Sequence, residues 1–558
     1  MQNNTKHKLS IYLFLLLALS VLSYFSFIGS YGEYGEGLIN SDAHNYMGML
    51  AARDHPENFT TDIALHNALE STKIFKTIHM PLVSWLADGD DYAGAWAALM
   101  PVHMFIYLLG FFLLGMVLFR HVGWAVFFAV FLSIYVRTEW VTFWGLSSVS
   151  LRTTYAALLG FVLALALKYK EDCRWWPLVL AGAGGLAYMH TVSMPVGGLM
   201  VWVGFASQLF YMNKKQAKKS IGWLLVAGIS FLVCVAPAVW GYLSNHTPLD
   251  AKSSEYLWTS LKHRSPSYFD FVGSLTSFFV GSLSRSLLFI SAMVSVAYVL
   301  KVASLEHRKK ILMISGWALG AFICGSVLYP LDQLWAKFNN SWPMQISLGR
   351  ANRYLIPTSM MLASYGAYVF WEHADGPKKR WIVIAGLLIL LITPIIEFKG
   401  RGAYKTVAFG VQKVISDPRW LFNPRGYGFV DQEKPWITAA KANIPVGARV
   451  YTTYGNLGLE LRNGALRGVL FSQKDVGWLH YTVPDQFVAS LDIFMKLRNK
   501  LPSNQSQVPS YTLAELKVAK SLKAEYFIYD LLKVSEDMVR KEWMPIWTDG
   551  KVTIAVRR

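Results

Sequence analysis

Long apolar runs dominate this sequence and decide what the chain can fold into. A helix needs about 20 mostly apolar residues to cross the roughly 30 Å hydrocarbon core of a bilayer, and we find eleven runs of about that length, the third to fifth being the shortest. Their expected bounds are 9–28, 95–119, 122–136, 153–167, 176–190, 194–212, 221–243, 271–300, 311–329, 354–371 and 381–396. We therefore expect a polytopic α-helical membrane protein with about eleven transmembrane helices.

Composition agrees with a membrane protein. Of the 558 residues, 54% are hydrophobic and only 16% are charged, whereas soluble domains carry about 25% charged residues. Three cysteines are too few for a disulfide framework, and two of them, Cys234 and Cys324, lie in apolar runs where thiols are inert. Lys6 and Lys8 precede the first run as in a signal peptide, but no small-residue cleavage site follows, so we expect an uncleaved anchor.

Basic residues set the expected orientation. With the N-terminus in the cytoplasm, the inner segments hold 17 Lys and Arg in about 45 residues, and the outer segments between spans hold 11 in about 135. This is the bias of the positive-inside rule. It fails only around the third span, where the inner segment holds Arg120 alone and the outer segment holds Arg137 and Arg152. The net charge of +18 thus follows from topology, and we predict no nucleic-acid partner.

The segment after Glu397 is too polar to be membrane-embedded. An odd number of spans places it outside the cytoplasm, and helical segments at 436–443 and 513–522 alternate with extended ones at 448–454, 525–529 and 552–556. We therefore predict two domains. The first is a transmembrane domain, residues 1–397, that includes an outer loop at 30–94, and the second is an extracytoplasmic α/β domain, residues 398–558.

The first outer loop, residues 30–94, is the most informative segment. It holds ten acidic residues and is far longer than a connection requires. Apolar residues from Ala43 to Ala51 recur at helical spacing, which predicts an amphipathic helix on the bilayer surface. Asp42 opens this helix. It fits a simple N-cap, and it also fits a carboxylate that stays ionised at the membrane face and accepts a proton from a hydroxyl group.

Two histidines lie where the chain meets the same membrane face. His79 stands two residues before Pro81 ahead of the second span, and His190 ends the fifth span. Either side chain can bind a phosphate oxygen or relay a proton, and an interfacial histidine bonded to the backbone is the alternative for His79. No HxxH or Glu-His spacing indicates a metal site.

Arginines at the ends of the expected spans, or inside them, are further candidate functional residues. Arg152 opens the fourth span, Arg350 and Arg353 open the tenth, and Arg285 falls inside the eighth. Charged residues there are costly and usually functional, and the planar guanidinium suits phosphate. The alternative for helix-end arginines is snorkelling to lipid headgroups. The sequence contains no P-loop, GxSxG, HExxH or CxxC motif.

The arrangement resembles the GT-C superfamily of membrane glycosyltransferases. The segment around Asp42 (SDAHNY) looks like the acidic loop-one motif, His79-Met80-Pro81 looks like the segment before span two, and Arg350 to Arg353 lie where members commonly place a lipid-phosphate-binding arginine. The tail (WITAAKANIPVGARVYTTYGN, then AEYFIYD) looks like the outer domain of bacterial members. Many members carry a second acid beside the first, whereas Ala43 follows Asp42 here. We therefore predict no cofactor, and a divalent metal has no support in the sequence.

This resemblance implies transfer of a sugar from a polyprenyl-phosphate donor to an acceptor glycan, lipid or protein on the outer face of the bacterial inner membrane, within cell-envelope polysaccharide biosynthesis. Asp42 would be the general base on the acceptor, and Arg350, Arg353 and Arg152 would neutralise the leaving phosphate. His79 and His190 would line the cleft. The partners implied are the lipid-linked donor, the acceptor and membrane lipids.

Rival functions remain open at this point. A transporter or flippase for a lipid-linked glycan would also place arginines at the membrane face, although it should show more charge within its spans. A non-catalytic assembly subunit would use the first loop and the outer domain as binding surfaces. A polysaccharide polymerase or ligase is a close variant of the transferase and is not separated from it by sequence.

Overall fold

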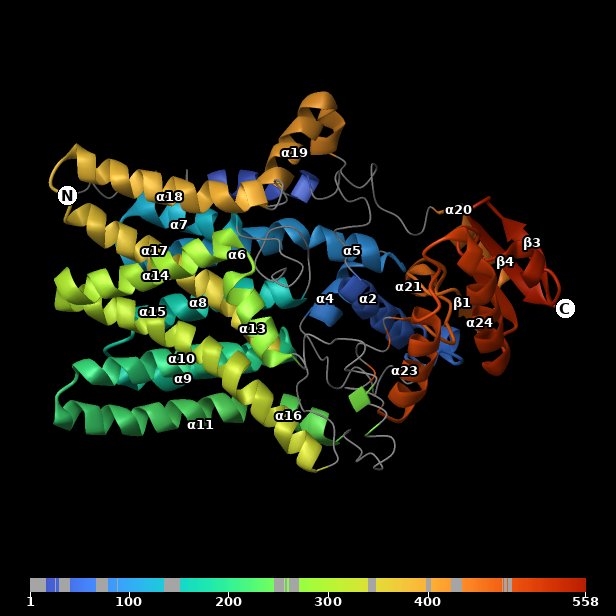
Figure 1. Cartoon of the computed structure of the whole chain (residues 1–558), viewed down its shortest axis with the longest axis horizontal. Coiled ribbons are helices and arrows are strands. Elements are labelled where there is room, and N and C mark those ends of the chain that lie inside the picture. The colour runs from blue at the N-terminus through green and yellow to red at the C-terminus, as the bar shows by residue number, and fades with distance from the viewer. Residues whose placement is uncertain are drawn as a thin grey trace. The chain divides into compact units, whose positions relative to one another are not determined.

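The structure is a computed structural model of the whole chain (Figure 1). It describes residues 17–25, 27–29, 41–66, 79–87, 89–134, 151–244, 255, 258–259, 270–339, 348–397, 403–422, 434–473, 475, 479 and 484–558. These residues form two compact units. Unit 1 comprises the described residues of Met1–Leu38, Ala98–Ala238 and Ser267–Tyr427, and unit 2 comprises those of Ile39–Ala97, Val239–Pro266 and Gly428–Arg558.

Unit 1 is built from helices. Its α-helices are α6 (Met100–Phe119), α7 (Val122–Ile134), α8 (Leu151–Lys168), α9 (Trp176–Gly185), α10 (Met194–Gln208), α11 (Lys214–Ser244, which continues past the limit of the unit), α13 (Phe271–Val280), α14 (Leu283–Val302), α15 (Leu305–Ile323), α16 (Tyr329–Phe338), α17 (Leu355–Glu372), α18 (Pro377–Glu397) and α19 (Ala403–Ser416). Short turns join them, namely η2 (Cys173–Trp175), η3 (Leu186–Tyr188), η4 (Thr191–Ser193), η5 (Leu209–Tyr211), the π-helical η7 (Cys324–Leu328), η8 (Leu348–Tyr354) and η9 (Pro418–Leu421).

Several of these helices suit a bilayer. Among the described residues, five helical stretches are long and apolar enough to cross a membrane, namely Val102–Phe119, Thr191–Tyr211, Lys214–Gly241, Leu283–Val302 and Leu305–Phe338. The protein is thus a polytopic helical membrane protein. The count of eleven spans stays a prediction.

Glycines let the helices of unit 1 approach closely. A Cβ atom on Gly320 of α15 would lie 2.6 Å from the carbonyl oxygen of Leu199 on α10, and one on Gly316 would lie 2.8 Å from the Cα atom of Gly204. Gly110 of α6 meets the Ala157 carbonyl of α8 in the same way. Close packing through small residues drives helix association in lipid, and it accounts for the side-by-side pairs α10–α15 and α6–α8 (Figure 1).

The eighth expected span is two helices. α13 ends at Gly281, and Ser282 has extended backbone angles and caps α14 through its side chain, which accepts a hydrogen bond from the Arg285 amide at 3.5 Å. A serine N-cap after a glycine is a common helix break. Arg285, expected inside the span, therefore lies in the first turn of α14.

Unit 2 combines the first loop with the C-terminal segment. Its elements are α2 (Ser41–Asp54), η1 (Pro56–Phe59), α4 (His79–Leu86), α5 (Tyr92–Ala98, whose last residue belongs to unit 1), α20 (Pro435–Asn443), β1 (Val450–Thr452), α21 (Leu457–Glu460), the π-helical η12 (Leu461–Ala465), α23 (Pro484–Arg498), η14 (Gln505–Gln507), α24 (Val508–Ser521), β2 (Tyr526–Asp530), α25 (Glu536–Val539), β3 (Trp543–Thr548) and β4 (Val552–Arg557). A domain boundary at residue 397 stays a prediction.

The four strands form one sheet in the order β1-β2-β4-β3. β1 runs parallel to β2, with Val450 opposite Tyr526, while β4 is antiparallel to both β2 and β3. Gly550, with a φ of +84°, lies in the β3–β4 turn, where a positive φ favours glycine. β1, β2 and β4 overlap the three extended segments expected from the sequence, and β3 is additional. A core that includes Trp436 of α20, Ile528 and Ile554 packs α20 onto the sheet.

Candidate active site

The helix of the first loop begins where the sequence indicated. α2 starts at Ser41, so Asp42 is its second residue. The side chain of Asp42 lies outside the described residues, as does that of His79, the first residue of α4. An N-cap stands before the first helical residue, so Asp42 at the second position of α2 is not the N-cap. The roles of Asp42 as base and of His79 as a phosphate ligand stay predictions.

The prediction that α2 lies on the bilayer surface is wrong. Met47, Leu50 and Ala51, which are residues of its predicted apolar face, are at most 1% exposed, and so are Met49 and Ala52 outside that pattern. α2 packs on α21 and η12 of the C-terminal segment. The apolar spacing was read correctly, but the face it creates is covered by protein, which no local pattern distinguishes from lipid.

A buried arginine joins the first loop to the C-terminal segment. Arg462 of η12 is 2% exposed and lies between Asp62 and Asp475, both 0% exposed. Its Nε and Nη2 atoms donate to the two oxygens of Asp62, each at 2.7 Å, and its Nη1 and Nη2 atoms donate to Asp475 at 2.6 and 2.9 Å. Burial lowers the pKa of the guanidinium, but the two carboxylates raise it more, so its pKa lies above the ordinary value. The group is therefore a fixed cation.

Backbone amides complete this network. Asp62 accepts hydrogen bonds from Ala64 and Leu65 at 3.0 and 2.9 Å and from Val469 at 2.8 Å. On the α2 side, a Cβ atom on Gly48 would lie 3.7 Å from Cδ of Arg462. The arginine is thus packed directly under α2 and holds the helix to the rest of unit 2. Sequence reasoning missed it because Asp62 and Arg462 are 400 residues apart.

The last turn of α2 is tied within the first loop. Ser84 of α4 accepts a hydrogen bond from Nη2 of Arg53 at 2.7 Å and donates to Oδ2 of Asp54 at 2.8 Å, and the Tyr92 hydroxyl donates to the same oxygen at 2.9 Å. Burial raises the pKa of Asp54, but hydrogen bonds from Ser84, from Tyr92 and from Nε of Arg53, which donates to Oδ1 at 2.9 Å, together hold it below its ordinary value. The carboxylate therefore stays ionised and fixes α2 to α4, the helix that begins at His79.

A second buried carboxylate lies in unit 2. Glu515 of α24 is 0% exposed and accepts hydrogen bonds from the hydroxyls of Tyr451 and Tyr511 and from the backbone amide of Tyr454 at 2.9 Å. Burial raises the pKa of Glu515. This group anchors α24 to β1 and its following turn.

In unit 1, the predicted arginines Arg350 and Arg353 lie on a short 3₁₀ turn, η8, directly ahead of α17, the helix of the tenth expected span. Arg353 is 6% exposed and Arg350 is half-buried. The turn packs against η7, where Ser326 donates to Oδ1 of Asn352 at 3.0 Å, and a Cβ atom on Gly325 would lie only 2.5 Å from that oxygen. A buried Arg353 is not a snorkelling side chain, so the structure disfavours that alternative for this residue.

The helix that carries Arg152 meets the same turn. Arg152 is the second residue of α8 and its side chain is not among those described. One turn later, the Tyr155 ring contacts the Tyr354 ring of η8 edge-to-face, with centroids 6.5 Å apart. α8 and η8, which bear Arg152 and Arg353, are thus in contact at one end of unit 1, which we call the arginine end.

His190 lies close to the arginine end. It is 8% exposed, sits between η3 and η4, and its Nδ1 atom forms a 2.8 Å hydrogen bond with the Ser193 hydroxyl. The helix α10 that follows contacts α8 closely, because a Cβ atom on Gly197 would lie 2.0 Å from the Tyr155 hydroxyl oxygen.

The structure adds one pair that sequence reasoning missed. His103 of α6 and Thr154 of α8 are buried, and their side chains form a 2.8 Å hydrogen bond at the arginine end. Among the described residues, no three His, Cys, Asp or Glu side chains lie close enough to hold a metal ion.

Comparisons with known proteins give no sequence relative: neither a protein-family model nor a curated protein matches the chain. Solved structures do match. A crystal structure of the Archaeoglobus fulgidus oligosaccharyltransferase, tethered with an acceptor peptide containing the NVT sequon, is 12% identical with a TM-score of 0.51 over 98% of this chain and 74% of that one. The chain therefore shares the fold of this oligosaccharyltransferase.

A second solved structure also matches along nearly the whole of both chains. ArnT from Cupriavidus metallidurans, bound to undecaprenyl phosphate, is 13% identical and matches 98% of this chain and 97% of its own with a TM-score of 0.48. A fold shared with an oligosaccharyltransferase is the fold that the resemblance to the GT-C superfamily implies, and this likeness does not test the segments around Asp42, His79 and Arg350 to Arg353. The role of each of these residues stays a prediction.

Proposed function

We propose that this protein is a membrane glycosyltransferase that moves a sugar from a polyprenyl-phosphate donor to an acceptor glycan, lipid or protein on the outer face of the bacterial inner membrane. The observation that carries the proposal is the fixation of α2 at its middle and at its last turn. Arg462 holds its middle to the C-terminal segment, and Asp54 holds its last turn to α4. A catalytic group needs such a rigid support, since small misplacements cost large factors in rate.

In the proposed reaction, the carboxylate of Asp42 takes the proton of an acceptor hydroxyl. The acceptor oxygen forms a bond to the anomeric carbon as the bond from that carbon to the phosphate oxygen breaks, and the configuration inverts. The polyprenyl phosphate leaves with the bonding electrons, and Arg350, Arg353 and Arg152 stabilise its charge. His79 and His190 line the cleft. No metal ion or cofactor is part of the proposal.

Two further features belong to the proposal. The N-terminus lies in the cytoplasm and the segment after residue 397 lies outside it, as the distribution of basic residues indicates. The oligosaccharyltransferase with the same fold was crystallised with a tethered acceptor peptide, which supports an acceptor site in this chain as well.

The test is mass spectrometry of lipid-linked and surface glycans. Cells would carry no copy, the intact protein, Asp42→Asn, or Glu57→Gln, with equal levels in the membrane. Glu57 is the matched control because it is a first-loop carboxylate that is 62% exposed. We expect the null and Asp42→Asn cells to lose one sugar addition and accumulate its donor, while Glu57→Gln restores it. Full rescue by Asp42→Asn would favour the transporter or assembly-subunit function instead.

A further inference from the structure

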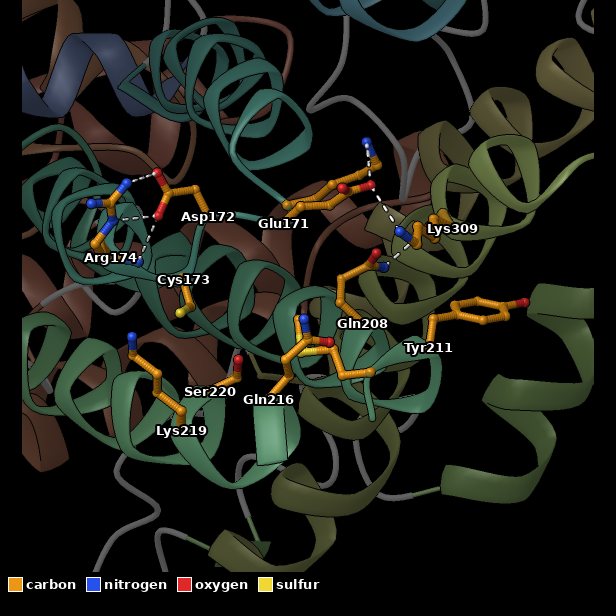
Figure 2. Close-up of a pocket in the computed structure, with 12 residues that line it drawn as sticks. Glu171, Asp172, Cys173, Arg174, Gln208, Tyr211, Gln216, Lys219, Ser220 and Lys309 are labelled. Atoms are coloured by element: carbon orange, nitrogen blue, oxygen red, sulfur yellow. Dashed lines mark hydrogen bonds and ion pairs between the residues drawn. The ribbon is translucent and has the colours of Figure 1, made fainter. Parts of the chain in front are cut away.

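A polar cavity of about 320 Å³ lies at the opposite end of unit 1 from the arginine end (Figure 2). It is enclosed by the turn between α8 and α9, the end of α10 with η5, the first turns of α11, and Lys309 of α15. These turns hold many of the lysines that the sequence places in the cytoplasm. We call it the lysine-end cavity, and the glycosyl-transfer proposal assigns it no role.

The lining of this cavity is positively charged. Four basic side chains, Lys170, Arg174, Lys219 and Lys309, line the cavity with two acidic ones, Glu171 and Asp172. Glu306 neutralises Lys170 from outside the lining, so the excess is one positive charge. Both acids of the lining are already engaged. Asp172 accepts hydrogen bonds from Nε and Nη2 of Arg174 at 2.9 and 2.8 Å, and Glu171 accepts one from Nζ of Lys309 at 3.1 Å.

Lys219 differs from the other basic residues. Lys170 pairs with Glu306 at 3.1 Å, whereas within the part of the chain that the structure describes Lys219 makes no hydrogen bond or ion pair. Figure 2 shows its side chain pointing to the side of the cavity formed by Cys173 and Arg174. An exposed ammonium group favours an anion. Asp172 takes Nε and Nη2 of Arg174, so Nη1 is the guanidinium nitrogen left to bind a phosphate oxygen beside Lys219.

A buried glutamine in the lining, Gln208, has an acceptor atom that needs a hydrogen-bond donor. Gln208 is 2% exposed, and its Nε2 atom donates to the Lys309 carbonyl at 3.1 Å and to the Ser207 hydroxyl at 3.2 Å. Turning the amide over would set its oxygen against the Lys309 carbonyl, so the orientation is fixed. Its Oε1 atom is buried and accepts no hydrogen bond from the described residues. A buried acceptor without a donor is costly, and a ligand hydroxyl would satisfy it.

The surroundings favour a lipid as the source of such a ligand. Beyond the cavity, α11 presents exposed apolar side chains along its length, with Leu225 at 60%, Ile229 at 59% and Leu232 at 62%. Phe210 of η5, beside the cavity, is 83% exposed. An exposed aromatic residue next to a change from lysines to apolar residues marks the water–lipid interface, and basic pockets at this level bind anionic headgroups.

We propose that the lysine-end cavity binds a glycerophosphate group, whose phosphate pairs with Lys219 and Arg174 and whose free hydroxyl donates to Oε1 of Gln208. The phosphatidylglycerol headgroup and free glycerol 3-phosphate share this chemistry. The apolar face of α11 favours the lipid, whose acyl chains would lie along it.

Native mass spectrometry of the full-length protein in phosphatidylcholine nanodiscs tests the proposal. Phosphatidylglycerol is added as the probe, and phosphatidylmethanol, which has the same charge but no free hydroxyl, is the comparison lipid. We expect intact protein to retain phosphatidylglycerol in preference to phosphatidylmethanol. Lys219→Gln should weaken retention about fivefold, as one lost surface cation implies. Lys215→Gln, on the same helix but outside the cavity lining, should leave it unchanged.

Each remaining outcome decides the proposal or its source. Equal loss of phosphatidylglycerol in Lys219→Gln and Lys215→Gln would overturn the site, and equal retention of both anionic lipids by the intact protein would overturn the hydroxyl contact. Glycerol 3-phosphate is added alone in a third arm. If it raises the Tm of the intact protein but not of Lys219→Gln, and phosphatidylglycerol does neither, the site stands and its source is the soluble ester. All readouts are independent of glycan transfer, so failure here leaves the proposed function untouched.

Discussion

Replacing Arg462 with Met should loosen the support of α2 by a large and measurable amount. The substitution removes four hydrogen bonds of 2.6 to 2.9 Å and leaves two carboxylates, Asp62 and Asp475, buried at 0% exposure without a cation. Breaking a buried ion pair in this way costs about 3–5 kcal/mol. A typical domain is stable by only about 5–15 kcal/mol, so the change is a large fraction of what holds unit 2 together.

Hydrogen–deuterium exchange of the purified protein measures this loss directly. Amide protection falls tenfold for each 1.36 kcal/mol of opening free energy, so α2 and η12 should exchange roughly 160- to 5,000-fold faster in Arg462→Met. Arg557→Met is the control, since Arg557 is an exposed arginine of the same unit. In this variant the amides of α2 and η12 should exchange at the rate of the intact protein. Because Asp42 is the second residue of α2, glycan transfer should fall together with protection.

A triple variant separates the charge from the packing. Adding Asp62→Asn and Asp475→Asn to Arg462→Met removes the uncompensated carboxylates, and neutral replacements of buried ion groups are often tolerated. We expect the triple variant to recover about 2 kcal/mol relative to the single one. Exchange of α2 in Arg462→Met within threefold of the intact protein would refute the reasoning, because the arginine would then not support the helix.

Three further predictions concern other parts of the structure. Ser84→Ala should weaken the link between α2 and α4 by about 1 kcal/mol, seen as roughly fivefold faster exchange in α4, because it loses two hydrogen bonds to partly exposed partners. Burial raises the pKa of Glu515, so at pH values between the ordinary glutamate pKa of about 4.3 and the raised pKa the folded state binds more protons than the unfolded state. Stability should therefore fall as the pH rises through this window. Tm measured against pH should show the fall in the intact protein and not in Glu515→Gln. Gly320→Val should abolish the α10–α15 contact, since even a Cβ atom would lie 2.6 Å from a backbone oxygen, and lower the yield of folded protein in detergent, whereas Gly386→Val, where nothing lies within 4 Å, should not.

The sequence predicted features that depend on nearby residues. The apolar run at 354–371 became α17, within one residue at each end, because a long hydrophobic segment is helical wherever it is buried. The break at Gly281 and Ser282 was missed, although a glycine followed by serine is a visible signal for it. The apolar spacing of α2 was found, but what covers it depends on residues 400 positions away.

For the candidate site, too, the sequence predicted what depends on nearby residues and missed what depends on distant ones. The position of Arg353 just before α17 followed from the start of an apolar run, whereas its burial against η7 and its proximity to α8 depend on tertiary packing. His103 was passed over because it lies within an apolar run, and its hydrogen bond to Thr154 joins two spans that the sequence cannot pair. Arg462 belongs to no local motif, and an isolated arginine in a polar C-terminal segment is expected to be exposed to solvent.

The bond between Asp62 and Arg462 also sets an order of events during synthesis. A ribosome that adds about 5–20 residues per second exposes Asp62 roughly 20–80 s before its partner 400 residues later. During that interval the first loop lacks the cation around which it closes, so α2 has no completed surface to pack on. Unit 2 therefore reaches its final form only after the membrane helices between its two parts have been inserted, and a prematurely released chain would carry the Asp42 segment without its support.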